Sequence, residues 1–171
     1  SDGRVVAWGS NVDGQTNVPV WLVNAVAVAV GRNHSMALRS DGTVVGWGNT
    51  GYGQTNVPVG LTNVVAVAGG GYHSLALRLD GTIMGWGRND YGQTNVPAGL
   101  TNVVAVAGGG YHSLALRSDG TAVAWGYDSS GQTNVPVWLT NAVAVAGGGG
   151  HSLALAPAES LIVFSLYGFP T

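Results

Sequence analysis

The sequence has no cysteine and no lysine, and few charged residues of either sign. Without cysteine, the chain cannot form disulfides, use a thiol nucleophile or bind zinc through thiolates. All six basic residues are arginine and the net charge is −2, so we expect no nucleic-acid surface, which needs clustered cations. The longest apolar stretches, such as residues 25–30, are far shorter than a membrane-spanning helix, and no membrane partner is expected. Ser1 opens directly into repeated sequence, so we expect no signal peptide in the printed chain.

Glycine is abundant, with 29 of 171 residues, and the chain carries a 39-residue internal repeat. The four copies occupy residues 2–40, 41–79, 80–118 and 119–157, and more than half of the positions are identical in all four. Each copy keeps an Asp-Gly pair, a tryptophan, a Gln-Thr-Asn-Val-Pro segment and a histidine at the same spacing. A period of this length indicates one supersecondary unit that is used several times.

The second copy predicts three short strands and no helix. Thr43–Gly48 is β-prone, Val64–Ala68 is apolar throughout, and His73–Arg78 partly alternates. We expect Val64–Ala68 to be buried on both faces. Asp80-Gly81 predicts a two-residue type I′ turn, in which both central residues have positive φ. The chain is therefore predicted to be all-β, with each unit a meander of apolar strand, histidine strand and tryptophan strand.

These motifs resemble the regulator-of-chromosome-condensation repeat family, whose members form β-propellers. The resemblance rests on Trp47-Gly48 followed by Gly53-Gln54, on the Val64–Ala68 run with its glycines, and on His73–Leu77, and it covers residues 2–157. The short copy with its Gln-Thr-Asn-Val-Pro segment is most similar to the propeller-type β-lactamase inhibitors, which have three-stranded blades. The resemblance implies a β-propeller and suggests a secreted or extracytoplasmic location.

Propellers of this family usually close with seven blades, whereas this chain has four copies. We therefore expect four three-stranded blades in a half-ring, completed to eight blades by a second chain, because open blade faces would expose large apolar patches. The alternatives are a cramped four-bladed ring or a part of a longer chain. Arg4–Gly9 is expected to be a tryptophan strand without the strands that should precede it. Residues 158–171 are expected to be a tail or a degenerate fifth-repeat strand, because Ser160–Ser165 aligns with the tryptophan strand.

The copies differ most in two loops, which follow the apolar strand and the tryptophan strand. The meander places both loops on one rim of the propeller, opposite the Asp-Gly turns. Tyrosine and arginine, which often dominate interface energies, are frequent there. We predict a ligand- or partner-binding rim of Asp13, Arg32, Asn33, Tyr52, Tyr72, Arg88, Asp90, Tyr91, Tyr111, Tyr127 and Asp128. The alternative is that these loops vary because nothing selects their sequence.

Other chemistry is not favoured by the residues. His34, His73, His112 and His151 could surround a metal in a small ring, but one structural histidine per blade explains them better, and no metal or cofactor is expected. Adjacent residues on a strand point to opposite faces, so the repeated His-Ser pair does not predict a nucleophilic dyad. Half of the eight acidic residues lie in the Asp-Gly turns. We therefore expect no enzyme.

The resulting prediction is a non-enzymatic binding scaffold that presents variable loops on one rim. One alternative is a proteinaceous inhibitor of a secreted hydrolase such as a β-lactamase. Another is a purely structural, self-assembling repeat protein. Trp21 and Trp138 replace glycines of the two middle copies, so they are expected either at a seam between chains or in local surface packing.

Overall fold

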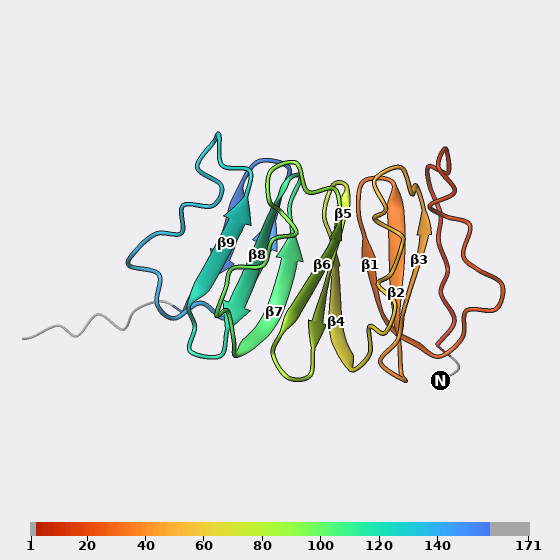
Figure 1. Ribbon diagram of the computed structural model, residues 1–171, viewed down its shortest axis with the longest axis horizontal. Helices are drawn as coiled ribbons and strands as arrows, with labels where there is room; N and C mark the ends of the chain where they lie inside the picture. Colours follow the sequence, from red (N-terminus) through yellow and green to blue (C-terminus); the bar gives the residue numbers. More distant parts are fainter. Residues whose placement is uncertain (1–2, 158–171) are drawn as a thin grey trace, which may run out of the picture.

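The computed structural model describes residues 3–157, which contain β-strands and no helix. The strands of one sheet follow one another along the chain with short connections, and longer loops join successive sheets (Figure 1). They are β1 (Ala25–Val30), β2 (His34–Arg39), β3 (Val44–Gly48), β4 (Val64–Gly69), β5 (His73–Arg78), β6 (Ile83–Gly87), β7 (Val103–Gly108), β8 (His112–Arg117), β9 (Ala122–Gly126), β10 (Ala144–Gly147) and β11 (Ser152–Leu155).

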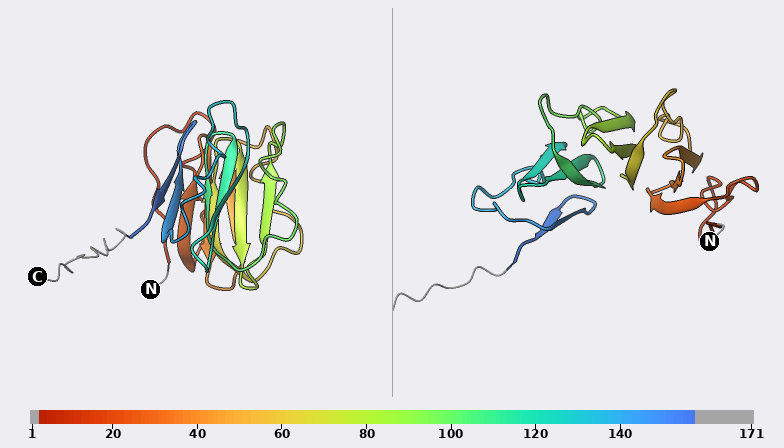
Figure 2. Two further views of the ribbon diagram at one scale, coloured as in Figure 1. Left: turned by 90° about the vertical axis from the view of Figure 1, so that its left-hand side faces the viewer. Right: turned by 90° about the horizontal axis from the view of Figure 1, so that it is seen from below.

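The strands form small antiparallel sheets, which we call blades, and each complete blade takes its first two strands from one repeat and its third from the next. Blade 1 has the order β1-β2-β3, blade 2 β4-β5-β6 and blade 3 β7-β8-β9, whereas blade 4 is the two-stranded sheet β10-β11 within the described residues. The four blades are arranged radially in an open arc whose two ends do not meet (Figure 2). The predicted all-β propeller architecture, with meander blades that straddle the sequence repeat, is confirmed.

The most deeply buried strand of each complete blade is its middle strand. The first five residues of β2, β5 and β8 are all buried. In β4, by contrast, only Val64 is buried and Val65 is exposed, so the prediction that Val64–Ala68 is buried on both faces is wrong. The first strands of successive blades lie beside one another on the inner side of the arc (Figure 2). Among residues 3–157, β5 and β8 have a strand on either side and a neighbouring blade on each face, whereas β2 has a neighbouring blade on one face.

The apolar side chains of neighbouring blades form shared cores. Met36 and Leu38 of blade 1 pack in one cluster with Val64, Ala76 and Trp86 of blade 2. An equivalent cluster joins blades 2 and 3 around the tryptophan of β9. A single three-stranded sheet could not bury these side chains by itself, so each blade depends on the next for its hydrophobic stabilisation.

The Asp-Gly turns differ from the predicted type I′ geometry. Gly42 has a φ of 76°, but Asp41 is not among the residues with positive φ. The Arg39 N–H bonds the Thr43 carbonyl at 2.9 Å, and the Gly42 N–H bonds the Arg39 carbonyl at 3.0 Å, which makes a three-residue loop with a glycine bulge. The Asp41 carboxylate accepts the Thr43 backbone N–H at 3.0 Å, which explains why aspartate precedes the glycine.

The two ends of the described chain carry unmatched pieces of a blade. Residues 4–9 have no strand assignment, contrary to the predicted tryptophan strand, because the described part of the chain gives them no neighbouring strand to pair with. At the other end, β11 is an edge strand where the complete blades have a third strand. The predicted degenerate strand at Ser160–Ser165 and the whole segment 158–171 lie outside the described residues.

Candidate functional site

The two variable loops of each blade lie side by side on one rim of the arc. Backbone hydrogen bonds join them: the Asn49 N–H bonds the Asn33 carbonyl at 2.8 Å, and the Arg88 N–H bonds the Tyr72 carbonyl at 2.9 Å. The third blade repeats this bond between the loop after β9 and the turn before β8. The chain connectivity alone predicted this shared rim, because consecutive antiparallel strands return each second connection to the same edge.

Five tyrosines of this rim form a continuous aromatic cluster. The ring centroids of Tyr72 and Tyr111 are 5.8 Å apart in a stacked arrangement, and they join equivalent turns of blades 2 and 3. Tyr52 packs edge-on against Tyr72 at 5.4 Å, and Tyr91 packs against Tyr111 at 5.5 Å and Tyr127 at 4.5 Å. Such aromatic contacts contribute about 0.5–1.5 kcal/mol each beyond the area they bury. The cluster thus orders the rings into one surface across three blades.

Arg88 lies at the centre of the cluster. Its guanidinium carbon is 4.7 Å from the ring centre of Tyr52, 5.2 Å from that of Tyr111 and 5.6 Å from that of Tyr72. Its Nε also donates to Asp90 Oδ2 at 2.6 Å, and this bond raises the pKa of Arg88. A guanidinium over several ring faces is a cation–π arrangement, which fixes the arginine side chain on the rim.

Arg32 adds the turn between β1 and β2 of blade 1 to the cluster. One of its terminal nitrogens donates to the Tyr72 hydroxyl at 2.9 Å, and its guanidinium carbon is 5.7 Å from the centre of the same ring. The side chains of Tyr52 and Tyr91 are exposed, and those of Tyr72, Tyr111 and Tyr127 are half-buried. The rim therefore presents Tyr52 and Tyr91 to solvent, beside the half-buried rings and the partly covered Arg88 side chain.

The other predicted rim residues have mainly local roles. The Asp13 carboxylate accepts hydrogen bonds from the side-chain amides of Asn33 and Asn49, and these bonds hold its pKa below the usual value. Asp128 accepts the backbone N–H of Thr133 at 2.8 Å. Hydrogen bonds from the side chain and the backbone of Thr133 lower the pKa of Asp128. Of the eleven predicted residues, the structure thus gathers eight around the tyrosines and uses Asp13, Asn33 and Asp128 to shape loops. Asn49 was not predicted, and its repeat partners give no signal for it because they are Ser10, Arg88 and Tyr127.

A buried hydrogen-bond chain at the blade boundaries was also missed by the sequence reasoning. The rings of His34, His73 and His112 each lie with Nε2 within 3.0 Å of a serine Oγ that follows 40 residues later, in the next blade. Ser74 Oγ donates to the Gln54 carbonyl at 2.8 Å, and Trp86 Nε1 donates to the same oxygen at 2.9 Å. The histidine ring therefore bonds a side chain of the next blade instead of nearby backbone.

The hydrogen bonds from His34 through Ser74 to Gln54 define which atoms carry the protons. The one hydroxyl proton of Ser74 goes to Gln54, so Ser74 Oγ accepts from His34, whose Nε2 must carry hydrogen. His34 Nδ1 is buried without a hydrogen-bond partner in residues 3–157. Burial lowers the pKa of His34 to about 4. The serine is thus a hydrogen-bond link in the core and has no base that could activate it as a nucleophile.

Two further features of the described residues bear on function. Within residues 3–157, no three His, Asp or Glu side chains come together in a way that could hold a metal ion. No helix of this part is long and apolar enough to cross a membrane.

The chain is similar in structure to several solved β-propellers. It superposes on Prp20p from Saccharomyces cerevisiae with a TM-score of 0.72 and 22% identity, covering 86% of this chain and 50% of that one. Human WBSCR16 gives a TM-score of 0.67 and 23% identity, with 84% and 51% covered. The ectodomain of the Physcomitrella patens receptor kinase CR4 gives 0.65 and 25%, with 80% and 37% covered. This chain therefore spans about half the length of these structures or less.

No curated protein sequence matches the chain. The family model for the regulator of chromosome condensation (RCC1) repeat matches residues 25–54, 64–93 and 103–132. These matches cover more than half of the chain and run from the start of each blade through its Gly-Gln pair. With the radial three-stranded blades, they show that the chain belongs to the RCC1 repeat family.

Proposed function

We propose that this chain is a non-enzymatic binding module that uses the tyrosine–arginine rim to bind a protein partner. The observation that carries the proposal is the continuous cluster of Tyr52, Tyr72, Tyr91, Tyr111 and Arg88 on a rigid set of blades. Tyrosine and arginine are enriched among residues that dominate interface energies, and rings that are already ordered lose little entropy on binding. None of these residues belongs to the apolar clusters that blades 1 and 2 or blades 2 and 3 share, so packing of these cores does not explain why they are tyrosine and arginine.

The relatives support the class of function. Prp20p is described by its binding to Gsp1p and histones, and a yeast RCC1 structure is described as bound to Kap60. These proteins are no more than 26% identical to this chain. We therefore carry over protein binding as the class of activity and none of these partners by name.

A narrower form of the proposal is inhibition of a secreted hydrolase such as a β-lactamase. It is supported by the aromatic side chains of Tyr72 and Tyr111 in the turn between the first and second strands of their blades. Blades 1 and 4 have Asn33 and Gly150 at these positions. An inhibition assay against a class A β-lactamase tests this form separately from the general one.

Affinity capture with a rim variant tests the general proposal. Wild-type chain and the double variant Tyr72→Ala/Tyr111→Ala are immobilised side by side and exposed to extracellular proteins and to a glycan array. The matched control is Leu79→Ser, which changes an exposed residue beside the Asp-Gly turn on the opposite rim. We expect one protein to be retained by wild type and the control and lost from the double variant. Equal retention of a protein by all three chains would contradict the proposal. If none of the three chains retains a protein or a glycan, the better account is a purely structural repeat protein.

We also propose that two chains associate through the ends of the arc, so that the rim becomes part of a closed ring. The ends expose Val26, Val28 and Val30 of β1 on one side and Leu153 and Leu155 of β11 on the other. Covering such apolar faces is strongly favourable, at about 25 cal/mol for each Å² removed from water. The mass of the chain in solution tests this association.

A further inference from the structure

At the boundaries inside the arc, the leucine in the middle of the second strand of blades 2 and 3 is buried by the next blade. Leu75 and Leu114, at the same position of β5 and β8, are 0% and 2% exposed. Leu153, the equivalent residue of β11, is 63% exposed. Within residues 3–157, blade 4 therefore has a second strand that is folded as in the other blades, but no third strand and no neighbouring blade cover it.

The opposite end of the chain carries the piece that is missing. Trp8 corresponds to Trp47, Trp86 and Trp125, which are each 8% exposed, yet Trp8 is 84% exposed. Val6 corresponds to Val123 of β9 and is also exposed. Residues 4–9 thus have the sequence of a third strand, and the part of the chain that the structure describes gives them no second strand to pair with.

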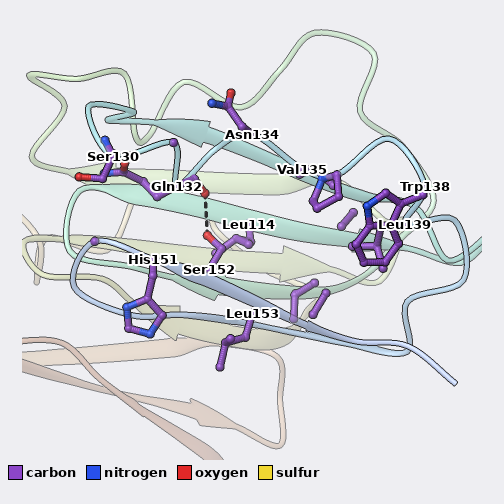
Figure 3. A pocket seen from close by; sticks show the side chains of 16 residues that line it. Leu114, Ser130, Gln132, Asn134, Val135, Trp138, Leu139, His151, Ser152 and Leu153 are labelled. Carbon is purple, nitrogen blue, oxygen red and sulfur yellow. Dashed lines mark hydrogen bonds between the residues drawn. The ribbon is translucent and has the colours of Figure 1, made fainter. Parts of the chain in front are cut away.

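A groove beside β11 has the lining of a tryptophan-strand site. Leu114, Val135, Leu139 and Leu153 provide its apolar walls, and the groove encloses about 340 Å³ (Figure 3). One repeat earlier, Val96 and Leu100 occupy the positions of Val135 and Leu139, and there they pack in one cluster with Trp125 of β9. Trp138 also lines the groove, where the preceding repeat has Gly99. The groove next to β11 otherwise corresponds to the site of Trp125, without the tryptophan of a third strand.

The polar groups of the groove are incomplete in the same way. In blade 3 the Gln93 carbonyl accepts from both Ser113 Oγ at 2.7 Å and Trp125 Nε1 at 3.0 Å. In blade 4 the Gln132 carbonyl accepts from Ser152 Oγ at 2.7 Å, and no second donor reaches it from the described residues. An indole N–H is the group that this carbonyl bonds elsewhere in the molecule.

We infer that Arg4–Gly9 of one chain adds to β11 of a second chain as the third strand of its blade 4, and that the second chain does the same in return. This inference rests on the proposed two-chain ring and specifies how its seam is built. Trp8 then enters the groove beside β11 and donates Nε1–H to the Gln132 carbonyl. The pairing of β8 with β9 gives the register, because Ser113 lies opposite Trp125 and Ala115 opposite Val123. The same register places Trp8 opposite Ser152 and Val6 opposite Ala154.

The histidine–serine chain supports the same seam independently. Each of the first three histidines bonds a serine 40 residues later, which leaves His151 as a donor and Ser35 as an acceptor without this bond in residues 3–157. Ser35 Oγ already donates to the Gln15 carbonyl at 2.8 Å, so it is free to accept from a histidine as Ser74 does. Across the seam, His151 of one chain reaches Ser35 of the second chain, and Leu153 covers the exposed Val28.

A second copy fits the groove better than the last residues of the same chain. In the sequence alignment of the repeats, position 164 corresponds to the tryptophan and is phenylalanine, which has no N–H to give to the Gln132 carbonyl. Trp8 has this donor. The tests below therefore also include a shortened protein of residues 1–157, in which residues 158–171 cannot fill the groove.

Engineered cysteines test the strand addition, since the natural sequence has no cysteine to interfere. The double variant Val6→Cys/Ala154→Cys places two thiols directly opposite in the inferred register, at a Cα separation that a disulfide can span. The control Ala7→Cys/Ala154→Cys is one residue out of register, so its thiols point to opposite faces. We expect a covalent dimer on non-reducing gels for the first variant and none for the control. Equal cross-linking of both variants, no cross-linking of either, or a disulfide within one chain would each overturn the inference.

Sedimentation of Trp8→Ala separates failure of the strand addition from failure of the two-chain ring. We expect its dimer dissociation constant to rise at least about tenfold, because a central buried tryptophan is lost. The control Val59→Ala removes a fully exposed apolar side chain from the loop between blades 1 and 2 and should leave the constant unchanged. If all variants are dimers but the cysteine pair forms no cross-link, the strand addition is overturned and the two-chain ring stands. If every variant is a monomer, both proposals are overturned. Cross-linking that appears only after residues 158–171 are removed would assign the groove to those residues instead.

Discussion

His34 Nε2 lies 3.0 Å from Ser74 Oγ, across the boundary between blade 1 and blade 2. Both side chains are buried, and the same contact recurs at the next two boundaries. The bond makes each blade boundary polar at one point inside an otherwise apolar interface. Since a buried donor needs an acceptor, this bond fixes the position of one blade along the next.

The buried histidines predict a loss of stability between pH 6.5 and pH 4. Burial lowers the pKa of His34 and His73 to about 4 from 6.5, so the unfolded chain binds more protons than the folded chain in this range. The free energy of unfolding should fall as the pH decreases through this window, by roughly 3 kcal/mol for each histidine at pH 4. Urea unfolding at intervals from pH 7.5 to pH 4 measures this change.

The aspartates of the turns act in a separate window. Bonds from Thr43, Thr82 and Thr121 lower the pKa of the aspartate two residues before each threonine from 3.8. Their contribution is present above pH 3.8 and is lost only below it. A stability that stays constant from pH 7 to pH 4 would therefore contradict the role given to the histidines.

Removing the serine hydroxyl at an internal boundary should destabilise the chain more than removing it at the open end. Ser74→Ala leaves the buried Nε2–H of His34 without an acceptor, which costs about 1–3 kcal/mol. Ser35→Ala loses the bond to the Gln15 carbonyl but leaves no histidine unpaired, so it should cost about 1 kcal/mol. Chemical denaturation of both variants as monomers at pH 7.5 gives the comparison, and equal losses would argue against the histidine–serine bond.

Two glycines at equivalent turns should respond differently to alanine. A Cβ on Gly110 would lie 2.3 Å from the carbonyl oxygen of Gly149, in the neighbouring blade. Gly110→Ala must therefore separate two blades and should lower stability by about 1–3 kcal/mol. A Cβ on Gly149 meets nothing within 4 Å in the described single chain, so Gly149→Ala should be nearly neutral there. Melting temperatures of the two variants at low concentration distinguish them.

The rim tyrosines should matter less for folding than the blade tryptophans. Tyr111→Ala removes contacts with neighbouring rings at the surface and should cost about 1–2 kcal/mol. Trp86→Ala empties a shared core between blades 1 and 2 and should cost about 3–5 kcal/mol. Thermal unfolding of the two variants tests this order. If Tyr111→Ala were the more damaging change, the ring would belong to the core and would lose its assignment to a binding surface.

The sequence predicted the blades and the shared rim because both follow from repetition and connectivity. An interval of 39 residues between identical motifs fixes the unit, and short connections force antiparallel neighbours. The repeat interval and the short connections within a blade suffice to place Tyr72 and Tyr111 on the same rim of the propeller. The ordering of five tyrosines around Arg88 could not be predicted, since it depends on how far apart successive turns lie in space.

Other features were missed because they depend on neighbours that are distant in the sequence. The apolar run Val64–Ala68 indicates burial, yet most of it is only half-buried in β4. The strand that is buried between two blades is β5, which contains His73–Leu77, and one of these blades begins about 39 residues after the start of β4. The adjacent His73-Ser74 pair gives no sign that each residue bonds a residue 40 positions away. The Asp-Gly pair is compatible with two turn geometries, and the hydrogen bond that the Thr43 N–H donates to the Asp41 carboxylate favours the one observed.

The fold, the rim and the proposed self-association all depend on the boundary between blades. The most direct measurement is sedimentation equilibrium of the 171-residue chain at micromolar concentration. Two chains that complete each other's end blades should give twice the single-chain mass of 17.3 kDa. A monomer of 17.3 kDa that remains stable across the concentration range would contradict the claim that the exposed ends are halves of one interface.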